Sequence, residues 1–156
     1  MKLKHTRFQL LLELICLLLL LAMFAFVSAK WQNLPEKIPA HFNAAGEIDR
    51  WGNKDELWFL PGISVFLYGL ITAVTFLPAI WNIPGKIKEE NIPAVYTCTK
   101  TMLIALKLEV ILVFFTITYF MTIASPLPGW FTPFFLIFVF GTILCGVILT
   151  VRKGRQ

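Results

Sequence analysis

The chain has 156 residues, of which 58% are hydrophobic and 15% are charged. Globular proteins average about 45–50% apolar and about 25% charged residues, so a soluble domain of this length would lack the charged surface that it needs. The apolar residues gather in four blocks, and no segment between them is long enough to bury a core of its own. The composition therefore indicates one membrane domain over residues 1–156. It excludes a large catalytic domain, a Rossmann fold and a soluble nucleic-acid module, and we expect no nucleic-acid partner.

The four apolar blocks are predicted to be transmembrane helices at about residues 8–29, 57–81, 101–124 and 132–151. Each has roughly 20–25 residues, enough to cross about 30 Å of hydrocarbon as a helix. Their Leu, Phe and Ile runs show no two-residue alternation, which disfavours a β-barrel. Only helices then satisfy every backbone group in lipid, so the predicted fold class is all-α, a four-helix bundle in the bilayer.

The distribution of charge predicts how the helices are oriented. Basic residues dominate both terminal segments and the connection 82–100, whereas segment 30–56 carries five acidic and four basic residues. Positive residues favour the cytoplasmic side, so both termini and the connection 82–100 are expected inside. Segment 30–56 is then an extracytoplasmic cap. Trp31, Trp51, Trp58 and Trp130 would lie near the outer interface, as an aromatic belt does.

The first block has a second interpretation, because it has a basic start, an apolar stretch and a Val27-Ser28-Ala29 ending that resembles a signal-peptidase site. Its apolar stretch is longer than the roughly 7–15 residues that are usual for a signal peptide, and it contains Glu13. We therefore expect an uncleaved first helix.

Small residues recur at helical spacing in three blocks. The pairs are Ala25 with Ala29, Gly69 with Ala73, and Thr142 with Gly146. Small residues at this spacing let helix backbones approach closely in a membrane. Packing within the bundle is the favoured interpretation, and a homodimer through these helix faces is the alternative.

Three charged residues fall inside predicted membrane helices: Glu13, Lys107 and Glu109. A charge at depth costs on the order of 2.5–3.5 kcal/mol even on insertion scales. Glu13 and Lys107 are expected at similar depth, so an ion pair that fixes helix register is favoured. Glu109 lies two residues from Lys107 and faces elsewhere, so one acid is left over. A proton- or cation-handling site at Glu13 or Glu109, and snorkelling to the surface, are the alternatives.

The predicted cap holds a dense polar set flanked by tryptophans. Its candidate ligand- or partner-binding residues are His41, Asn43, Gly46, Asp49, Trp51 and Lys54. Asn43 and Asp49 are suited to bond turn amides, and Lys54 to pair with Asp49. One His without a second His or a Cys does not support a metal site. Residues 31–60 contain no Ser, Thr or Cys, so they offer no such nucleophile, and we expect neither an enzyme nor a cofactor.

The run LPEKIPAHFNAAGEIDRWGNK at residues 34–54 resembles the signature of a bacterial membrane family, the domain of unknown function 1648. The likeness continues through the connection 82–100 to Lys107 and covers about residues 30–110. The matching positions are Leu34, Pro35, Ile38, Pro39, His41, Phe42, Asn43, Gly46, Asp49, Gly52, Lys54 and Pro61.

The resemblance implies a bacterial inner-membrane protein, because the family includes part of the Sdp-type immunity proteins. Those proteins protect a bacterium from its own secreted killing peptide. The favoured role is therefore immunity to, or recognition of, a membrane-active peptide or another membrane protein. A small-solute or proton-coupled transporter component and an accessory or sensor subunit are the alternatives. Beyond the lipid bilayer, the expected partner is a secreted peptide or a membrane protein.

Overall fold

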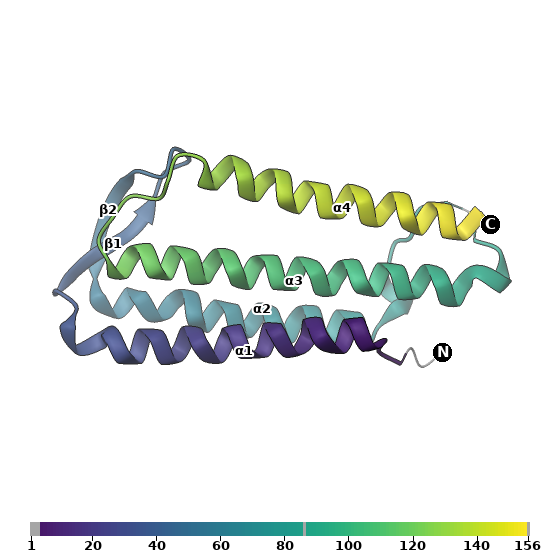
Figure 1. Cartoon of the computed structure of the whole chain (residues 1–156), viewed down its shortest axis with the longest axis horizontal. Coiled ribbons are helices and arrows are strands. Elements are labelled where there is room, and N and C mark those ends of the chain that lie inside the picture. Colours follow the sequence, from purple (N-terminus) through teal and green to yellow (C-terminus); the bar gives the residue numbers. More distant parts are fainter. Residues whose placement is uncertain (1–3, 86, 156) are drawn as a thin grey trace.

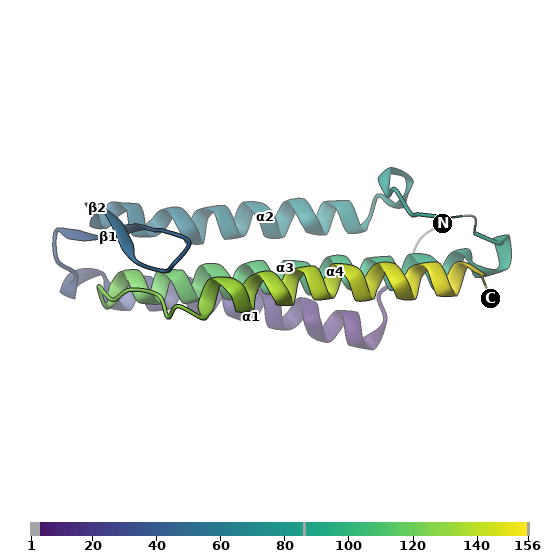
Figure 2. The ribbon, with the colours of Figure 1, turned by 90° about the horizontal axis from the view of Figure 1, so that it is seen from above.

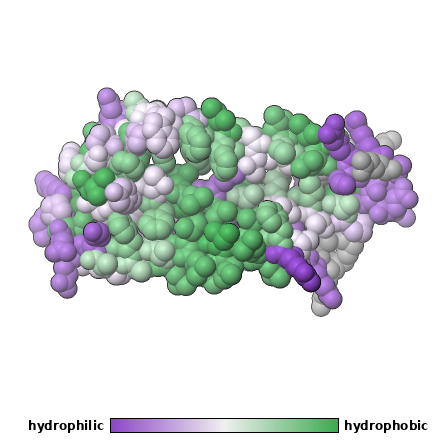
Figure 3. All heavy atoms as spheres, viewed as in Figure 1, coloured by the Kyte–Doolittle hydropathy of each residue, from purple (hydrophilic) through white to green (hydrophobic). Residues whose placement is uncertain are grey.

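The computed structural model describes residues 4–85 and 87–155. Four helices run roughly along one axis (Figures 1 and 2), and each belongs to a segment long and apolar enough to cross a membrane. The surface in Figure 3 is apolar along its middle and hydrophilic at both ends, as a bilayer requires. The chain is therefore a multi-pass membrane protein. Its helices are α1 (Arg7–Lys30), α2 (Phe59–Thr75), α3 (Ile92–Thr122) and α4 (Phe131–Arg155).

Helix α3 is the central element, since it packs against α1, α2 and α4. Helix α4 makes its main helix contacts with α3, and Figure 2 shows it apart from α2. The arrangement is a three-helix group of α1, α2 and α3 with α4 on a further side of α3. The sequence predicts the four helices of the bundle but not this arrangement, in which a cavity lies between α2 and α4 beside α3.

Helix α1 begins where the sequence predicts, because a capping box fixes its start. The backbone N–H of Gln9 donates to Thr6 Oγ1 at 3.1 Å, and the N–H of Thr6 donates to Gln9 Oε1 at 3.0 Å. These bonds satisfy backbone donors that have no partner inside the helix.

Helix α2 is shorter than the predicted 57–81. A 3-10 turn at Lys54–Trp58, with a capping box between Asn53 and Glu56, leads into it, and it ends at Thr75. Pro78 follows, and a proline disfavours helical backbone in the residue before it. The Trp81 indole donates to the Val74 carbonyl at 2.8 Å, which satisfies a carbonyl near the helix end.

Helix α3 begins at Ile92, well before the predicted residue 101, so the connection between α2 and α3 is shorter than 82–100. Pro93 lies in the first turn, where no backbone donor is lost. The hydroxyls of Thr97, Thr99 and Thr101 donate to carbonyls one turn earlier, at 2.8–3.1 Å. These bonds give the hydroxyls partners within the helix, which begins about nine residues before its predicted start.

The segment predicted as a cap contains a β-hairpin, so the described fold is not purely α-helical. Strand β1 (Lys37–Phe42) pairs antiparallel with β2 (Ile48–Asn53), after a 3-10 turn at Trp31–Asn33. Figure 1 shows this hairpin at the end of the helices opposite both termini. We call the two ends of the molecule the hairpin end and the terminal end.

A buried apolar cluster attaches the hairpin to the helices. Ile38 of β1 packs with Val27 of α1, with Met121 of α3 and with Leu57 of the 3-10 turn before α2. All four side chains are buried. Alternate residues of a strand face opposite sides, so Ile38 can enter the core while neighbours stay exposed. The hairpin is therefore held on the helix ends by hydrophobic packing.

Of the small residues at helical spacing, some lie at contacts between helices and others do not. A Cβ atom on Gly146 would collide with Met102 of α3, so this glycine permits the close approach of α4. A Cβ atom on Gly69 or on Gly141 would meet no other atom of the described residues within 4 Å. The predicted packing role therefore holds for Gly146.

Candidate functional site

The hairpin turn is built around Asn43, as its side-chain chemistry predicts. Asn43 Oδ1 accepts from the N–H groups of Ala45 at 2.9 Å and Glu47 at 3.0 Å. Its Nδ2 donates to the Glu47 carboxylate at 2.9 Å. Gly46 has φ +86°, a left-handed conformation that favours glycine. These bonds replace the backbone pairs that the chain loses as it reverses direction.

The turn also contacts the connection between α3 and α4. The backbone N–H of Leu127 donates to the Gly46 carbonyl at 2.8 Å. A Cβ atom on Gly46 would lie 2.6 Å from the Leu127 carbonyl oxygen, so a larger residue does not fit. Gly46 therefore joins the hairpin to a segment about 80 residues away in sequence, the connection that leads into α4.

Two polar side-chain pairs connect the strands and the following turn. His41 Nδ1 lies 2.6 Å from Asp49 Oδ1, and Arg50 Nη2 donates to Glu56 Oε2 at 2.8 Å. Arg50 also donates to the Ala40 carbonyl at 3.2 Å. The hydrogen bond to Glu56 raises the pKa of Arg50 above its ordinary value, so its charge is permanent. Because these groups are exposed, the pairs contribute more to shape than to stability.

Lys54 does not pair with Asp49, which corrects the sequence prediction. Its Nζ lies 3.5 Å from Glu36 Oε1 and 5.6 Å from the centre of the Trp31 ring. Asp49 is taken by His41 across the strands. The hairpin register decides these partners, and a charge pattern alone does not reveal the register.

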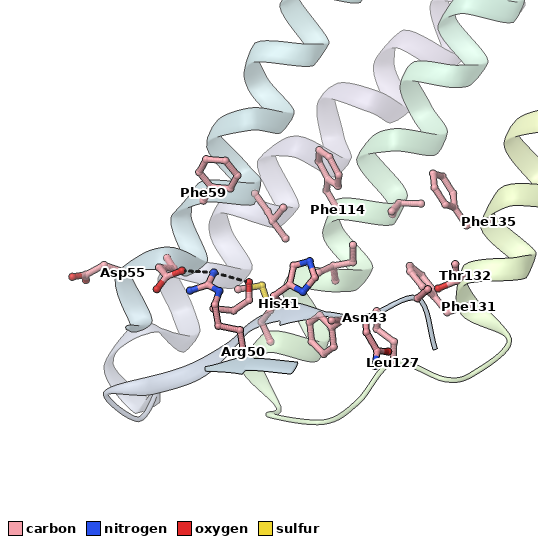
Figure 4. Close-up of a pocket in the computed structure, with 18 residues that line it drawn as sticks. His41, Asn43, Arg50, Asp55, Phe59, Phe114, Leu127, Phe131, Thr132 and Phe135 are labelled. Atoms are coloured by element: carbon pink, nitrogen blue, oxygen red, sulfur yellow. Dashed lines mark hydrogen bonds and ion pairs between the residues drawn. The ribbon is translucent and has the colours of Figure 1, made fainter. Parts of the chain in front are cut away.

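A cavity of about 1070 Å³ lies between the hairpin and the ends of α2, α3 and α4. Figure 4 shows Phe59 of α2, Phe114 of α3 and Phe135 of α4 around one space, with His41 between the strand and the helices. The hairpin side contributes polar groups, including Asn43, Arg50, Asp55 and Glu56. The helix side is almost entirely apolar: Phe59, Leu60, Val113, Phe114, Ile117, Met121, Phe131, Thr132 and Phe135.

Of the hairpin residues singled out in sequence, His41 and Asn43 line this cavity. Asp49 contacts the His41 ring, and Gly46 bonds the turn to Leu127. Trp51 and Lys54 do not line it. Sequence reasoning missed Arg50 and the phenylalanines of the helices. The signal for them is the presence of Phe near the hairpin end of three separate apolar blocks, which could have indicated a shared aromatic wall.

The predicted ion pair between Glu13 and Lys107 is present. Lys107 Nζ lies 2.6 Å from both carboxylate oxygens of Glu13 and donates to Thr72 Oγ1 at 2.8 Å. It also lies 4.4 Å from the centre of the Tyr68 ring. Lys107 is fully buried, and its charge is compensated from α1 and α2 together.

Glu109 is the acid left over, and it faces α4. The Thr142 hydroxyl donates to Glu109 Oε1 at 2.5 Å. Glu109 Oε2 is buried and has no hydrogen-bond partner among the described residues. The two acids of the membrane region therefore lie on different sides of α3 and have different partners.

The described part of the chain contains no cluster of three His, Cys, Asp or Glu side chains that could hold a metal ion. His41 and Asp49 lie together, but a pair of side chains is fewer than structural or catalytic sites use. The hairpin end therefore contains a mostly apolar cavity with charged and hydrogen-bonding groups along one side.

Comparison with known proteins supports the resemblance in the hairpin sequence. The family described as Domain of unknown function (DUF1648) matches residues 18–65. A protein described as "Uncharacterized protein" from Archaeoglobus fulgidus is 36% identical over 75 residues, which cover 39% of this chain and 41% of that protein. The aligned part thus spans about two fifths of that relative's length. No solved structure matches the chain.

The matched residues include much of α1, the whole hairpin and the start of α2, so they contain the polar side of the cavity. Residues 18–65 of this multi-pass membrane protein thus match the DUF1648 family, which supports the sequence resemblance over residues 30–65.

Proposed function

We propose that this protein binds a cationic, membrane-active peptide at its hairpin end. The apolar face of the peptide enters the cavity between α2, α3 and α4, and its basic residues contact the acidic hairpin. The observation that carries this proposal is the cavity itself, which combines a wall of phenylalanines with a polar side formed by the hairpin.

The size and lining of the cavity support a ligand of this kind. Ligand pockets in proteins commonly measure about 300–1000 Å³ and are mostly apolar, with a few polar groups that fix orientation. At about 1070 Å³ this cavity can hold several large side chains of a peptide. Phe59, Phe114 and Phe135 offer aromatic surface for such side chains.

The charge of the hairpin supports a cationic ligand. Residues 31–58 carry five acidic and three basic side chains. Asp55 lines the cavity, is exposed and makes no ion pair or hydrogen bond with the described residues. Amphipathic peptides that act on membranes are typically rich in Lys and Arg on their polar face. Complementary charge of this kind speeds association and selects the partner.

Capture of such a peptide at the membrane surface would keep its apolar face out of the lipid. This is the physical basis on which immunity or resistance, the role implied by the family resemblance, would follow from binding.

The test uses the full chain in nanodiscs of zwitterionic lipid and a fluorescent amphipathic helix made of Leu and Lys. Fluorescence anisotropy measures binding, and empty nanodiscs give the lipid background. Ala44 lines the cavity and its neighbour Ala45 does not, although both are exposed in the same turn. Ala44→Trp should fill the cavity and weaken binding by roughly tenfold or more, equal to about 1.4 kcal/mol. Ala45→Trp, the matched control, should bind as the wild type does.

Charge is tested separately with Asp55→Lys and with a Leu/Glu peptide that has the same apolar face. Both changes should weaken binding, because each removes the attraction between the hairpin and the basic residues. Equal binding by the Ala44→Trp, Ala45→Trp and wild-type proteins would contradict the proposal. So would equal binding of the Leu/Lys and Leu/Glu peptides.

A further inference from the structure

Glu109 of α3 is a buried carboxyl group whose partners do not balance a charge. Its side chain is 5% exposed. Oε1 accepts one hydrogen bond, from Thr142 of α4, and Oε2 is buried without a partner among the described residues. The group lies two residues past the midpoint of α3, so it sits near the middle of the apolar band.

The nearby cation is not available to neutralise Glu109. Lys107 Nζ is bound by both oxygens of Glu13 and by Thr72, on the side of α3 that faces α1 and α2. The other titratable side chains of this region are Cys16 of α1 and Tyr68 of α2, on that same side, and Cys145 of α4, near Thr142. None of them supplies a positive charge to Glu109.

An ionised carboxylate with one neutral donor is costly in a low-dielectric interior, whereas a carboxylic acid carries no net charge. A protonated carboxyl also has an O–H group, so one of its oxygens can donate a hydrogen bond as well as accept one. The arrangement of one satisfied and one unsatisfied oxygen therefore fits a group that holds a proton.

Two cavities flank Glu109 along one face of α3. The cavity at the hairpin end reaches Val113, one helical turn beyond Glu109. A second cavity of about 470 Å³ lies between α3 and α4 on the terminal side. Ala105, one turn before Glu109, lines this second cavity together with Thr142, the hydrogen-bond partner of Glu109. Each cavity therefore reaches a residue one helical turn from Glu109, on the same face of α3.

We propose that Glu109 is a proton-binding site in the middle of the membrane, which takes up and releases its proton through the flanking cavities. The ligand of this site is the proton, and the Thr142 hydroxyl orients the carboxyl that binds it. Glu109 itself does not line the cavity at the hairpin end, so a failure of peptide binding and a failure of the proton site can be distinguished.

The experiment uses N,N′-dicyclohexylcarbodiimide, an apolar reagent that reacts with protonated carboxyl groups in membranes. The carboxyl proton passes to a carbodiimide nitrogen while the carboxyl oxygen bonds the central carbon. An acyl shift to nitrogen then gives a stable N-acylurea, and no group leaves. The full chain in nanodiscs is treated at a series of pH values, and peptide mass spectrometry measures modification at each acid.

We expect Glu109 to be modified at acidic pH, with the modified fraction falling about tenfold per pH unit above its midpoint, as for a single titrating group. Glu13 serves as the matched acid and should stay unmodified, because Lys107 Nζ donates to both of its carboxylate oxygens. In the Lys107→Met protein Glu13 should become reactive, which shows that the reagent reaches this depth.

Modification of Glu13 in the Lys107→Met protein, with Glu109 of the wild type unmodified at every pH, would overturn the proposal. Modification of Glu109 that does not change with pH would overturn it as well. The Glu109→Gln protein must lose the adduct at this position, and its peptide binding at the hairpin end should be unchanged.

Discussion

Lys107 Nζ of α3 lies 2.6 Å from each carboxylate oxygen of Glu13 on α1, and the Lys107 side chain is completely buried. These two residues are 94 positions apart in sequence, so the pair fixes the register of two membrane helices. Thr72 of α2 completes the contact, which links all three helices of the group at one level.

Removing one partner of this pair should destabilise the protein. Glu13→Gln or Lys107→Met leaves a charge unpaired at depth, and breaking a buried pair in this way costs about 3–5 kcal/mol. The double substitution should recover much of that loss, as a double-mutant cycle of unfolding free energies in detergent would show. Glu109→Gln combined with Lys107→Met is the control and should be additive, since Glu109 bonds Thr142 instead. Additive losses for Glu13 and Lys107 would contradict the pair.

Gly46→Ala should loosen the hairpin from the connection between α3 and α4. The substitution adds strain at φ +86° and places a Cβ atom 2.6 Å from the Leu127 carbonyl oxygen. We expect a loss of about 1–3 kcal/mol, the usual cost of backbone strain, and faster exchange of the Leu127 amide hydrogen. Gly129→Ala is the control, because a Cβ atom there has no neighbour within 4 Å among the described residues. Equal stability of the two variants would show that the Gly46 contact does not hold the hairpin.

Stability should depend on pH through His5. Burial and the nearby Lys100 ammonium lower the pKa of His5 below its ordinary 6.5. The unfolded chain therefore binds a proton before the folded chain does, and the stability from neutral His5 is present above pH 6.5 and is lost as the pH falls below it. His5→Phe keeps a ring beside Phe76 and should remove this part of the pH dependence. The difference between wild-type and variant thermal midpoints, measured against pH, checks it, and a constant difference would refute the role of His5.

The orientation of the helices stays a prediction that labelling in intact cells can test. In a chain without its three native cysteines, Ala45→Cys should react with a membrane-impermeant maleimide, and Arg155→Cys should react after lysis. The basic residues at the terminal end are the physical reason, since they favour the cytoplasmic side. Labelling of position 155 from outside, with position 45 protected, would invert the orientation.

Much of the architecture follows from composition alone, because four apolar blocks of bilayer length leave few alternatives. The partner of Glu13 could also be predicted, since an unpaired charge at depth is too costly to ignore. The start of α3 could not, because Thr97 and Thr99 lie in a polar stretch that resembles a loop, and their hydroxyls find partners one turn earlier only in the folded helix. Sequence does not reveal where a hydroxyl bonds.

The hairpin and its cavity depend on contacts between distant segments. Strands β1 and β2 have no clear apolar alternation, and Pro39 lies within β1. The sequence pattern therefore does not predict these two strands. Asn43 could be assigned to the turn because its chemistry is local. Phe59, Phe114 and Phe135 surround one cavity because α4 lies apart from α2. The sequence of any one helix does not predict this separation.

Photo-crosslinking from α3 tests most directly whether the hairpin-end cavity binds a cationic amphipathic peptide. Phe114 lines the cavity, whereas the adjacent Phe115 packs on Phe26 of α1 with ring centres 5.9 Å apart. With p-benzoylphenylalanine in place of one or the other, irradiation in the presence of the Leu/Lys peptide should give an adduct from position 114 and none from position 115. Equal adduct yields at the two positions, or an adduct from position 115 alone, would contradict binding in the cavity.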